Sequence, residues 1–146
     1  MSNVAVVNIV RILDESKRGK VLAGMLRSAA EKWQKELAEL EKQHGEAREK
    51  LEKMGQDIGE ARFKQEREVR MLELDLRHLQ AKAQLDIESR REQARSKVLQ
   101  EISPIIDNLA KEKGLDLIFT VPAREIAFVA KATDITDELL AKVDAA

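Results

Sequence analysis

The fold is decided by residues 22–58, which read LAGMLRSAAEKWQKELAELEKQHGEAREKLEKMGQDI. Apolar side chains recur along this stretch at spacings of three and four residues, with two successive four-residue steps around Trp33. Such spacing is typical of a coiled-coil seam, the line along which one helix packs against another. The predicted seam consists of Leu22, Leu26, Ala29, Trp33, Leu37, Leu40, His44, Ala47, Leu51, Met54 and Ile58.

A second seam follows after a short break at Gly55–Gly59, which has a glycine at each end. A glycine-bearing break between two seams predicts an antiparallel helical hairpin that folds back at its tip. The second seam is interrupted at Arg90 and Arg91. Its residues are Val69, Leu72, Leu76, Leu79, Ala83, Ile87, Ala94, Val98, Ile102, Ile105 and Leu109.

The ends of both helices carry local signals. Asp14 or Ser16 offers a side-chain oxygen that can cap the first helix. The second helix should stop where Gly114 follows a basic last turn and precedes Leu115. The predicted helices run from about residue 16 to 54 and from about 60 to 113.

Pro104 lies inside the second seam rather than at one of its ends. Proline lacks a backbone N–H and clashes with the preceding turn, so it bends or ends most helices. We expect a kink or a short restart here, with Ser103 as the N-cap; an uninterrupted helix is the alternative.

Strands are predicted at the two ends of the chain. Val4–Val10 is a β-branched run, Leu115–Val121 is a second strand that Pro122 ends, and Glu125–Ala130 is a third. A short helix follows, with Thr136 as its N-cap. The result is an α+β fold in the order β-α-α-β-β-α. We expect one domain over 1–146, with a helical arm at 21–103 and a β-rich body formed by 1–20 and 104–146.

The predicted body is small, at roughly 60 residues, and has few large apolar side chains. A core of this size is marginally stable alone, and a three-stranded sheet leaves its edges open. We therefore expect the chain to form an oligomer through the body. The candidates for core and subunit contacts are Val4, Val6, Leu117, Phe119, Phe128 and Val129.

Composition excludes several kinds of partner. Charged residues make up 36% of the 146, yet 26 basic and 27 acidic side chains leave a net charge of −1, so we expect no nucleic-acid binding. The chain has no cysteine, which excludes disulfides and thiolate metal sites. No apolar run approaches the roughly 20 residues of a membrane span, so we expect no direct membrane insertion.

The sequence indicates a protein that is not an enzyme and needs no cofactor or metal. The only histidines are His44, whose seam position suits a polar residue that sets helix register, and His78, which has no metal-ligand partner nearby. No glycine-rich phosphate loop and no nucleophile–histidine–acid arrangement is present. The many carboxylates lie on predicted helix surfaces, where burial cannot tune them for acid–base chemistry.

One set of apolar residues on the second helix does not belong to its seam. At about 100° per residue it lies opposite the seam, which makes the helix apolar on two faces. The residues can pack against a second hairpin or protomer, can be incidental, or can form a client-binding stripe for unfolded polypeptide. They are Phe63, Met71, Leu74, Ala81 and Leu85.

Three segments resemble the Skp/OmpH family of periplasmic chaperones. The opening strand Val4–Asn8, followed by Ile12, Leu13 and Ser16, is similar to the family's N-terminal strand and connection. Residues 110–118, AKEKGLDLI, are similar to its helix-to-strand junction. Residues 134–140, DITDELL, resemble its C-terminal helix start. A charged helical hairpin lies between them, so the resemblance covers nearly the whole chain.

The resemblance implies a homotrimer in which strands of three chains form the body and three hairpin arms surround a cavity. It also implies ATP-independent binding of unfolded outer-membrane proteins in the periplasm by a mature form without its signal peptide. The chain differs from well-studied members in charge, because they are strongly basic and its isoelectric point is about 6.2.

Two other functions fit parts of the pattern. A prefoldin-like cytosolic holdase also has helical arms, but its strands lie between the two helices, and Gly55–Gly59 is too short to hold a β-hairpin. A structural coiled-coil spacer without clients fits the interspersed charges and the regular seams. The apolar stripe opposite the second seam favours the chaperone.

Overall fold

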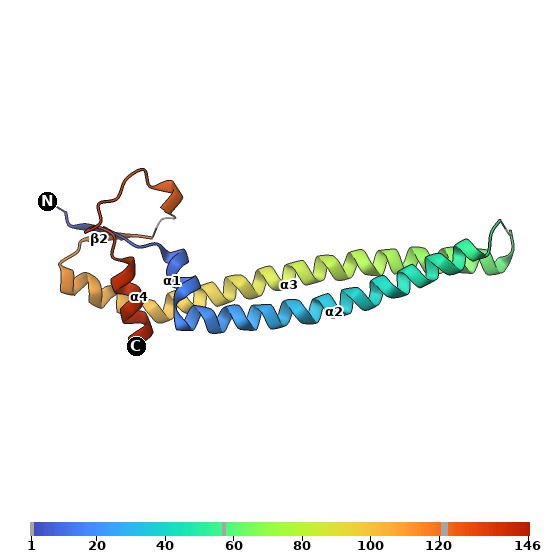
Figure 1. Ribbon diagram of the computed structural model, residues 1–146, viewed down its shortest axis with the longest axis horizontal. Coiled ribbons are helices and arrows are strands. Elements are labelled where there is room, and N and C mark those ends of the chain that lie inside the picture. Colours follow the sequence, from blue (N-terminus) through green and yellow to red (C-terminus); the bar gives the residue numbers. More distant parts are fainter. Residues whose placement is uncertain (1, 57, 121–122) are drawn as a thin grey trace. The chain divides into compact units, whose positions relative to one another are not determined.

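The computed structural model describes residues 2–56, 58–120 and 123–146. Two compact units are present: Met1–Met25 with Arg91–Ala146, here called the terminal unit, and Leu26–Arg90, here called the hairpin unit. The elements, labelled in Figure 1, are β1 (Val4–Val6), α1 (Ile9–Glu15), α2 (Lys17–Lys53), α3 (Glu60–Lys113), β2 (Leu117–Phe119), the 3-10 helix η1 (Ala123–Glu125) and α4 (Thr136–Ala145). No described helix is both long and apolar enough to cross a membrane.

The two long helices, α2 and α3, begin and end within about a residue of the predicted bounds. In the hairpin unit they run side by side in opposite directions (Figure 1). The seam residues of this unit are buried or half-buried, and Ala47, Val69 and Ala83 are the most buried apolar ones. Ile58 is an exception, because it lies in the connection between the helices and is 86% exposed, so its place in the predicted seam is wrong. Asp57 of the predicted tip lies outside the described residues.

The predicted strand Val4–Val10 is only partly correct. β1 ends at Val6, and the short helix α1 begins at Ile9. The switch occurs at Asn8, whose side-chain oxygen accepts a hydrogen bond from the Arg11 amide at 3.3 Å and so caps the helix. The helical turn buries Ile9 and Ile12 together on one face, which an extended chain would not do.

A sharp corner joins α1 to α2 at Ser16. The Ser16 backbone N–H bonds to the Ile12 carbonyl and closes α1, while its hydroxyl oxygen accepts from the Gly19 amide at 3.0 Å and caps α2. Of the two predicted caps, Ser16 is therefore the one used. The corner requires glycine at position 19, because a Cβ there would lie 1.7 Å from the Leu13 carbonyl oxygen.

Pro104 does not interrupt α3, so the predicted restart with Ser103 as cap is wrong. A proline inside a helix costs about 3 kcal/mol relative to alanine. The turns on either side of it carry Ile102 and Leu109, which are 0% and 1% exposed in the core of the terminal unit. Burial of these side chains requires one continuous helical face and offsets the cost of the missing backbone hydrogen bond.

The strands of the terminal unit form a small sheet around β1. β2 pairs with β1 in parallel, with Val4 opposite Leu117 and Val6 opposite Phe119. On its other edge Val6 forms a parallel bridge with Asp134, through hydrogen bonds to the Thr133 carbonyl and the Ile135 amide. Both edges of β1 are therefore occupied within the chain.

The predicted third strand, Glu125–Ala130, is wrong. Residues 123–125 form η1, and the segment up to 130 has no regular secondary structure. Asp134 takes the β1 edge that this strand would need, and Phe128 is left 84% exposed. The order of the described elements therefore includes a helix, α1, that was not predicted, and no third strand is present among the described residues. Val121 and Pro122, predicted to end the second strand, lie outside the described residues.

The core of the terminal unit joins both ends of the chain. It consists of alternate residues of β1 and its extension, one face of α1, the last turns of α3, and the inner face of α4. The buried residues are Ala5, Val7, Ile9, Ile12, Val98, Ile102, Leu109, Ile135, Leu139 and Val143. Val4, Leu117, Phe119 and Phe128, predicted as core or subunit contacts, are not part of this core and are exposed in the single chain. In β1 and β2 the reason is the two-residue alternation of a strand, which turns every second side chain outwards.

The end of α3 follows the prediction. Gly114 has a φ of 61°, its N–H bonds to the Lys111 carbonyl, and the Leu115 N–H bonds to the Ala110 carbonyl at 2.9 Å. These two bonds form a Schellman motif, in which a residue just after the helix adopts the left-handed conformation that favours glycine.

We expect Gly114→Ala to destabilise the protein by about 1 kcal/mol, because alanine is strained at positive φ. Gly24→Ala is the matched control. Gly24 lies inside α2, and a Cβ there would contact nothing within 4 Å, so alanine should stabilise by roughly 0.5–1 kcal/mol. Urea unfolding followed by circular dichroism measures both changes. Equal effects of the two substitutions would contradict the role assigned to Gly114.

Candidate client-binding surface

In the hairpin unit, Trp33, the only tryptophan of the chain, connects α2 to α3. Its indole N–H donates to a carboxylate oxygen of Asp86 at 2.8 Å, and the Arg90 Nε donates to the same oxygen at 2.8 Å. The hydrogen bond from Trp33, and after it the one from Arg90, lowers the pKa of Asp86. Lys82 lies over the Trp33 ring, 5.8 Å from its centroid. Trp33 thus ties α2 to α3 and is a packing residue.

Two polar residues lie within the apolar seam. The Gln65 side chain is buried and donates to the Ala47 carbonyl of the facing helix at 2.9 Å. His44 lies 3.6 Å from a carboxylate oxygen of Glu73, and its buried Nε2 has no hydrogen-bond partner among the described residues. His44 was predicted as a polar seam position, whereas Gln65 was missed. Gln65 lies one helical turn before the seam residue Val69, and this spacing could have indicated that Gln65 faces the seam.

The predicted stripe is exposed along α3. Phe63 and Met71 are each 56% exposed, Leu74 is 58% and Leu85 is 67%, and Ala81 is also exposed. On the opposite face of the same helix Leu72, Leu76 and Leu79 are half-buried and Ala83 is buried against α2. One apolar face of α3 therefore packs inside the hairpin, and a second apolar face is exposed to solvent. Exposed apolar residues along one line mark a surface that can bind another molecule.

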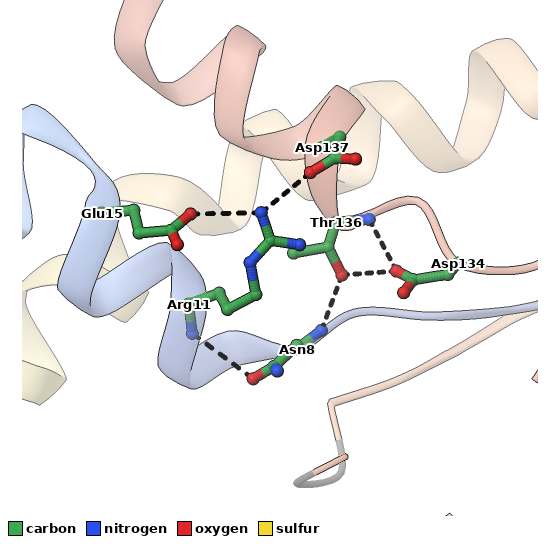
Figure 2. A network of polar contacts seen from close by, with 6 residues as sticks. All are labelled: Asn8, Arg11, Glu15, Asp134, Thr136 and Asp137. Carbon is green, nitrogen blue, oxygen red and sulfur yellow. Dashed lines mark hydrogen bonds and ion pairs between the residues drawn. The ribbon is translucent and has the colours of Figure 1, made fainter. Parts of the chain in front are cut away.

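The motif at residues 134–137, part of the segment that resembles a chaperone family, fastens the two chain ends (Figure 2). The Thr136 hydroxyl donates to Asp134 at 2.5 Å and accepts from the Asn8 amide at 2.9 Å. The Asp134 carboxylate also accepts from the Thr136 amide, at 3.0 Å. Thr136 was predicted as the N-cap of α4, and this prediction is wrong, because Thr136 is the first residue of the helix. Its hydroxyl accepts a hydrogen bond from the Asn8 amide and does not cap the helix.

An arginine of α1 completes this network. The Arg11 side chain donates to Glu15 at 3.1 Å and to Asp137, in the first turn of α4, at 2.9 Å. Both carboxylates raise the pKa of Arg11, with Glu15 as the larger cause. The network positions α1 against α4, so its role is structural.

The outer face of the β1–β2 pair is apolar and has no cover within the described chain. Val4 lies opposite Leu117 and Val6 opposite Phe119, and cross-strand partners share one face of a sheet. Val4, Leu117 and Phe119 are 37%, 48% and 45% exposed, whereas Val6 and Val129 are half-buried. These residues remain predicted subunit contacts.

The architecture defines a class of protein in which both chain ends build one small unit and the middle of the chain forms a long antiparallel helical hairpin. Residues 3–143 match the family of outer membrane proteins described as OmpH-like, and the chain belongs to this family. The predicted membership of the Skp/OmpH family is thereby confirmed.

A solved structure shares the fold. The crystal structure of a protein assigned as an OmpH-like outer membrane chaperone from Caulobacter crescentus CB15 has a TM-score of 0.71 and 21% sequence identity. The match covers 99% of this chain and 85% of that one. None of the curated proteins is a significant match.

Proposed function

We propose that this protein is an ATP-independent holdase chaperone that binds unfolded outer-membrane proteins and prevents their aggregation. Membership of the OmpH-like family supports a chaperone role in general. The observation that carries the specific proposal is the client-binding stripe of α3, Phe63, Met71, Leu74, Ala81 and Leu85, which is exposed and lies off the seam. Many weak apolar contacts of this kind suit sequence-tolerant capture and release without nucleotide.

We further propose that three chains assemble through the terminal unit and that their hairpins surround a cavity lined by the stripes. The uncovered apolar face of β1 and β2, together with Phe128 and Val129, would form the subunit contacts. Phe128, at 84% exposure, has the most to gain from cover by a neighbouring chain. The site of action would be the periplasm, where outer-membrane proteins pass unfolded.

Light scattering tests the assembly. We expect a mass of about three times 16.5 kDa, and a thermal midpoint that rises with protein concentration because unfolding is linked to dissociation. Phe128→Ser should shift the mass towards the monomer without reducing the helical content of the hairpin. A thermally stable monomer of the wild-type chain would rule out the trimer and the cavity.

The holdase activity is tested with a β-barrel membrane protein diluted from urea, with and without a stoichiometric amount of trimer. We expect suppressed light scattering in the absence of ATP and no change on its addition. Equal aggregation with and without the trimer would contradict the proposal. Photo-crosslinking from positions 74 and 85 separates a holdase from a spacer, because a spacer would yield only crosslinks between copies of the chain.

A further inference from the structure

The client-binding stripe is interleaved with arginines. Arg67, Arg70 and Arg77 are exposed on α3, and at about 100° per residue they fall with the stripe inside an arc of roughly 120° on the side opposite the seam. His78 shares this arc. The three arginines, here called the arginine trio, form no ion pair with any residue that the structure describes.

The acidic residues of the same helix segment lie outside that arc. Between residues 61 and 87 they are Glu66, Glu68, Glu73, Asp75 and Asp86. Glu66 pairs with Arg62 at 3.2 Å, Glu73 approaches His44, and Asp86 binds Trp33 and Arg90. Glu68 and Asp75 line shallow grooves beside α2, Glu68 with Ala47 and Asp75 with Leu40.

The other basic residues of the segment are already engaged. Lys82 lies over the Trp33 ring, Arg62 pairs with Glu66, and Lys64 lies 3.8 Å from Glu60. The stripe side of α3 is thus cationic and apolar, although the whole chain has a net charge of −1. Its basic part lies between Glu60, the first residue of α3, and Glu88, because both of these acidic residues fall in the same arc.

The outer face of α2 is different. Its exposed lysines, Lys32, Lys35 and Lys42, alternate with exposed acidic residues such as Glu39 and Glu46. Opposite charges so mixed leave little net field, whereas three arginines on a face without carboxylates add their fields. The outer face of α2 therefore lacks the segregation of charge that is found on the face of α3 that carries the stripe.

We propose that the arginine trio selects unfolded segments in which acidic residues lie close to aromatic or aliphatic ones. This inference rests on the proposed holdase function and names the class of client segment. The stripe would cover the apolar side chains, while the guanidinium groups pair with carboxylates of the client, for which arginine has the matching planar geometry. Charge complementarity thus adds a preference that apolar contact alone lacks.

The test compares three short disordered peptides with equal phenylalanine content, in which the intervening residues are glutamate, glutamine or lysine. Binding to the full-length protein is measured by fluorescence anisotropy. We expect the affinity order glutamate, glutamine, lysine. R67Q/R70Q/R77Q should weaken binding of the glutamate peptide about tenfold, since three exposed ion pairs each contribute roughly a factor of two. Binding of the glutamine peptide should change less than about twofold.

The matched control is K32Q/K35Q/K42Q, which removes the same charge from the outer face of α2 and should leave the peptide order intact. Raising NaCl from roughly 0.05 to 0.5 M should weaken binding of the glutamate peptide far more than binding of the glutamine peptide, because salt screens exposed charges. If the wild-type protein bound the three peptides with equal affinity and still held the β-barrel client, only the proposed acidic preference would be wrong. Failure to bind any of the three peptides while that client is still held would likewise overturn the acidic preference, whereas failure to hold the client would overturn the holdase function itself.

A membrane surface is the other partner that a cationic, apolar face could fit. Vesicles of phosphatidylglycerol and of phosphatidylcholine are therefore included. If the trio variant lost binding to phosphatidylglycerol vesicles and bound the glutamate peptide like the wild type, the arginines would serve lipid contact, and the inference would be wrong.

Discussion

Replacing Phe63, Leu74 and Leu85 together by glutamine is expected to remove most of the proposed holdase activity and to leave the protein folded. Each side chain is more than half exposed, so the folded state loses little apolar burial. A client that covers them gains at most about 1.5–3 kcal/mol for each. Losing three such contacts should weaken client affinity by more than a hundredfold even when the cover is partial.

The measurement is the concentration of protein that halves aggregation of a β-barrel client, together with circular dichroism and light scattering of the variant. Leu72→Ala and Leu76→Ala are the matched changes on the seam. They should loosen the hairpin by up to roughly 2 kcal/mol each, at the lower end for leucine truncation because both residues are half-buried. Unfolding of the triple variant would show that the stripe is a packing surface. A folded variant with full activity would place client contact elsewhere on the arm.

Ile102→Ala should be among the most destabilising single changes, at about 2–5 kcal/mol. Ile102 is 0% exposed and lies in the core that α3 shares with β1, α1 and α4. Truncation leaves a cavity in a small core, and domains as a rule have only about 5–15 kcal/mol of stability. Val10→Ala is the control, because Val10 is 49% exposed on α1. This substitution should lower the free energy of unfolding by less than about 0.5 kcal/mol.

Urea unfolding at a fixed protein concentration measures the difference, since the stability of an oligomer depends on concentration. The core joins residues from both ends of the chain, so its loss should also reduce the assembly mass seen by light scattering. Equal unfolding midpoints for the two variants would contradict the assignment of Ile102 to the core.

The hairpin could be predicted because its signals are local. Seam residues three and four apart lie on one helix face whatever the rest of the chain does, and Gly114 stops α3 by its own conformation. The exposed stripe could be predicted for the same reason, since helix geometry alone places it opposite the seam. Its client, in contrast, is not encoded in any one position and stays a proposal.

The terminal unit could be predicted only in outline, because contacts distant in sequence decide its details. Residues 4–10 read as one strand, yet the Asn8 amide bonds to the Thr136 hydroxyl, 128 positions away, and α1 begins beside it. Residues 125–130 have strand-forming side chains, yet Asp134 occupies the edge of β1. Pro104 would break an isolated helix, yet burial of Ile102 and Leu109 keeps α3 continuous.

By itself, the sequence determined the long helical hairpin, its tip, the end of α3 and the apolar stripe, because each depends on residues within a few turns of one another. Only the tertiary structure decided where β1 ends, which segments pair with its two edges and which side chains fill the terminal core. The physical reason is that strand pairing and core burial are satisfied by partners more than a hundred residues apart, such as Val4 and Leu117, and no local pattern specifies which partner is used.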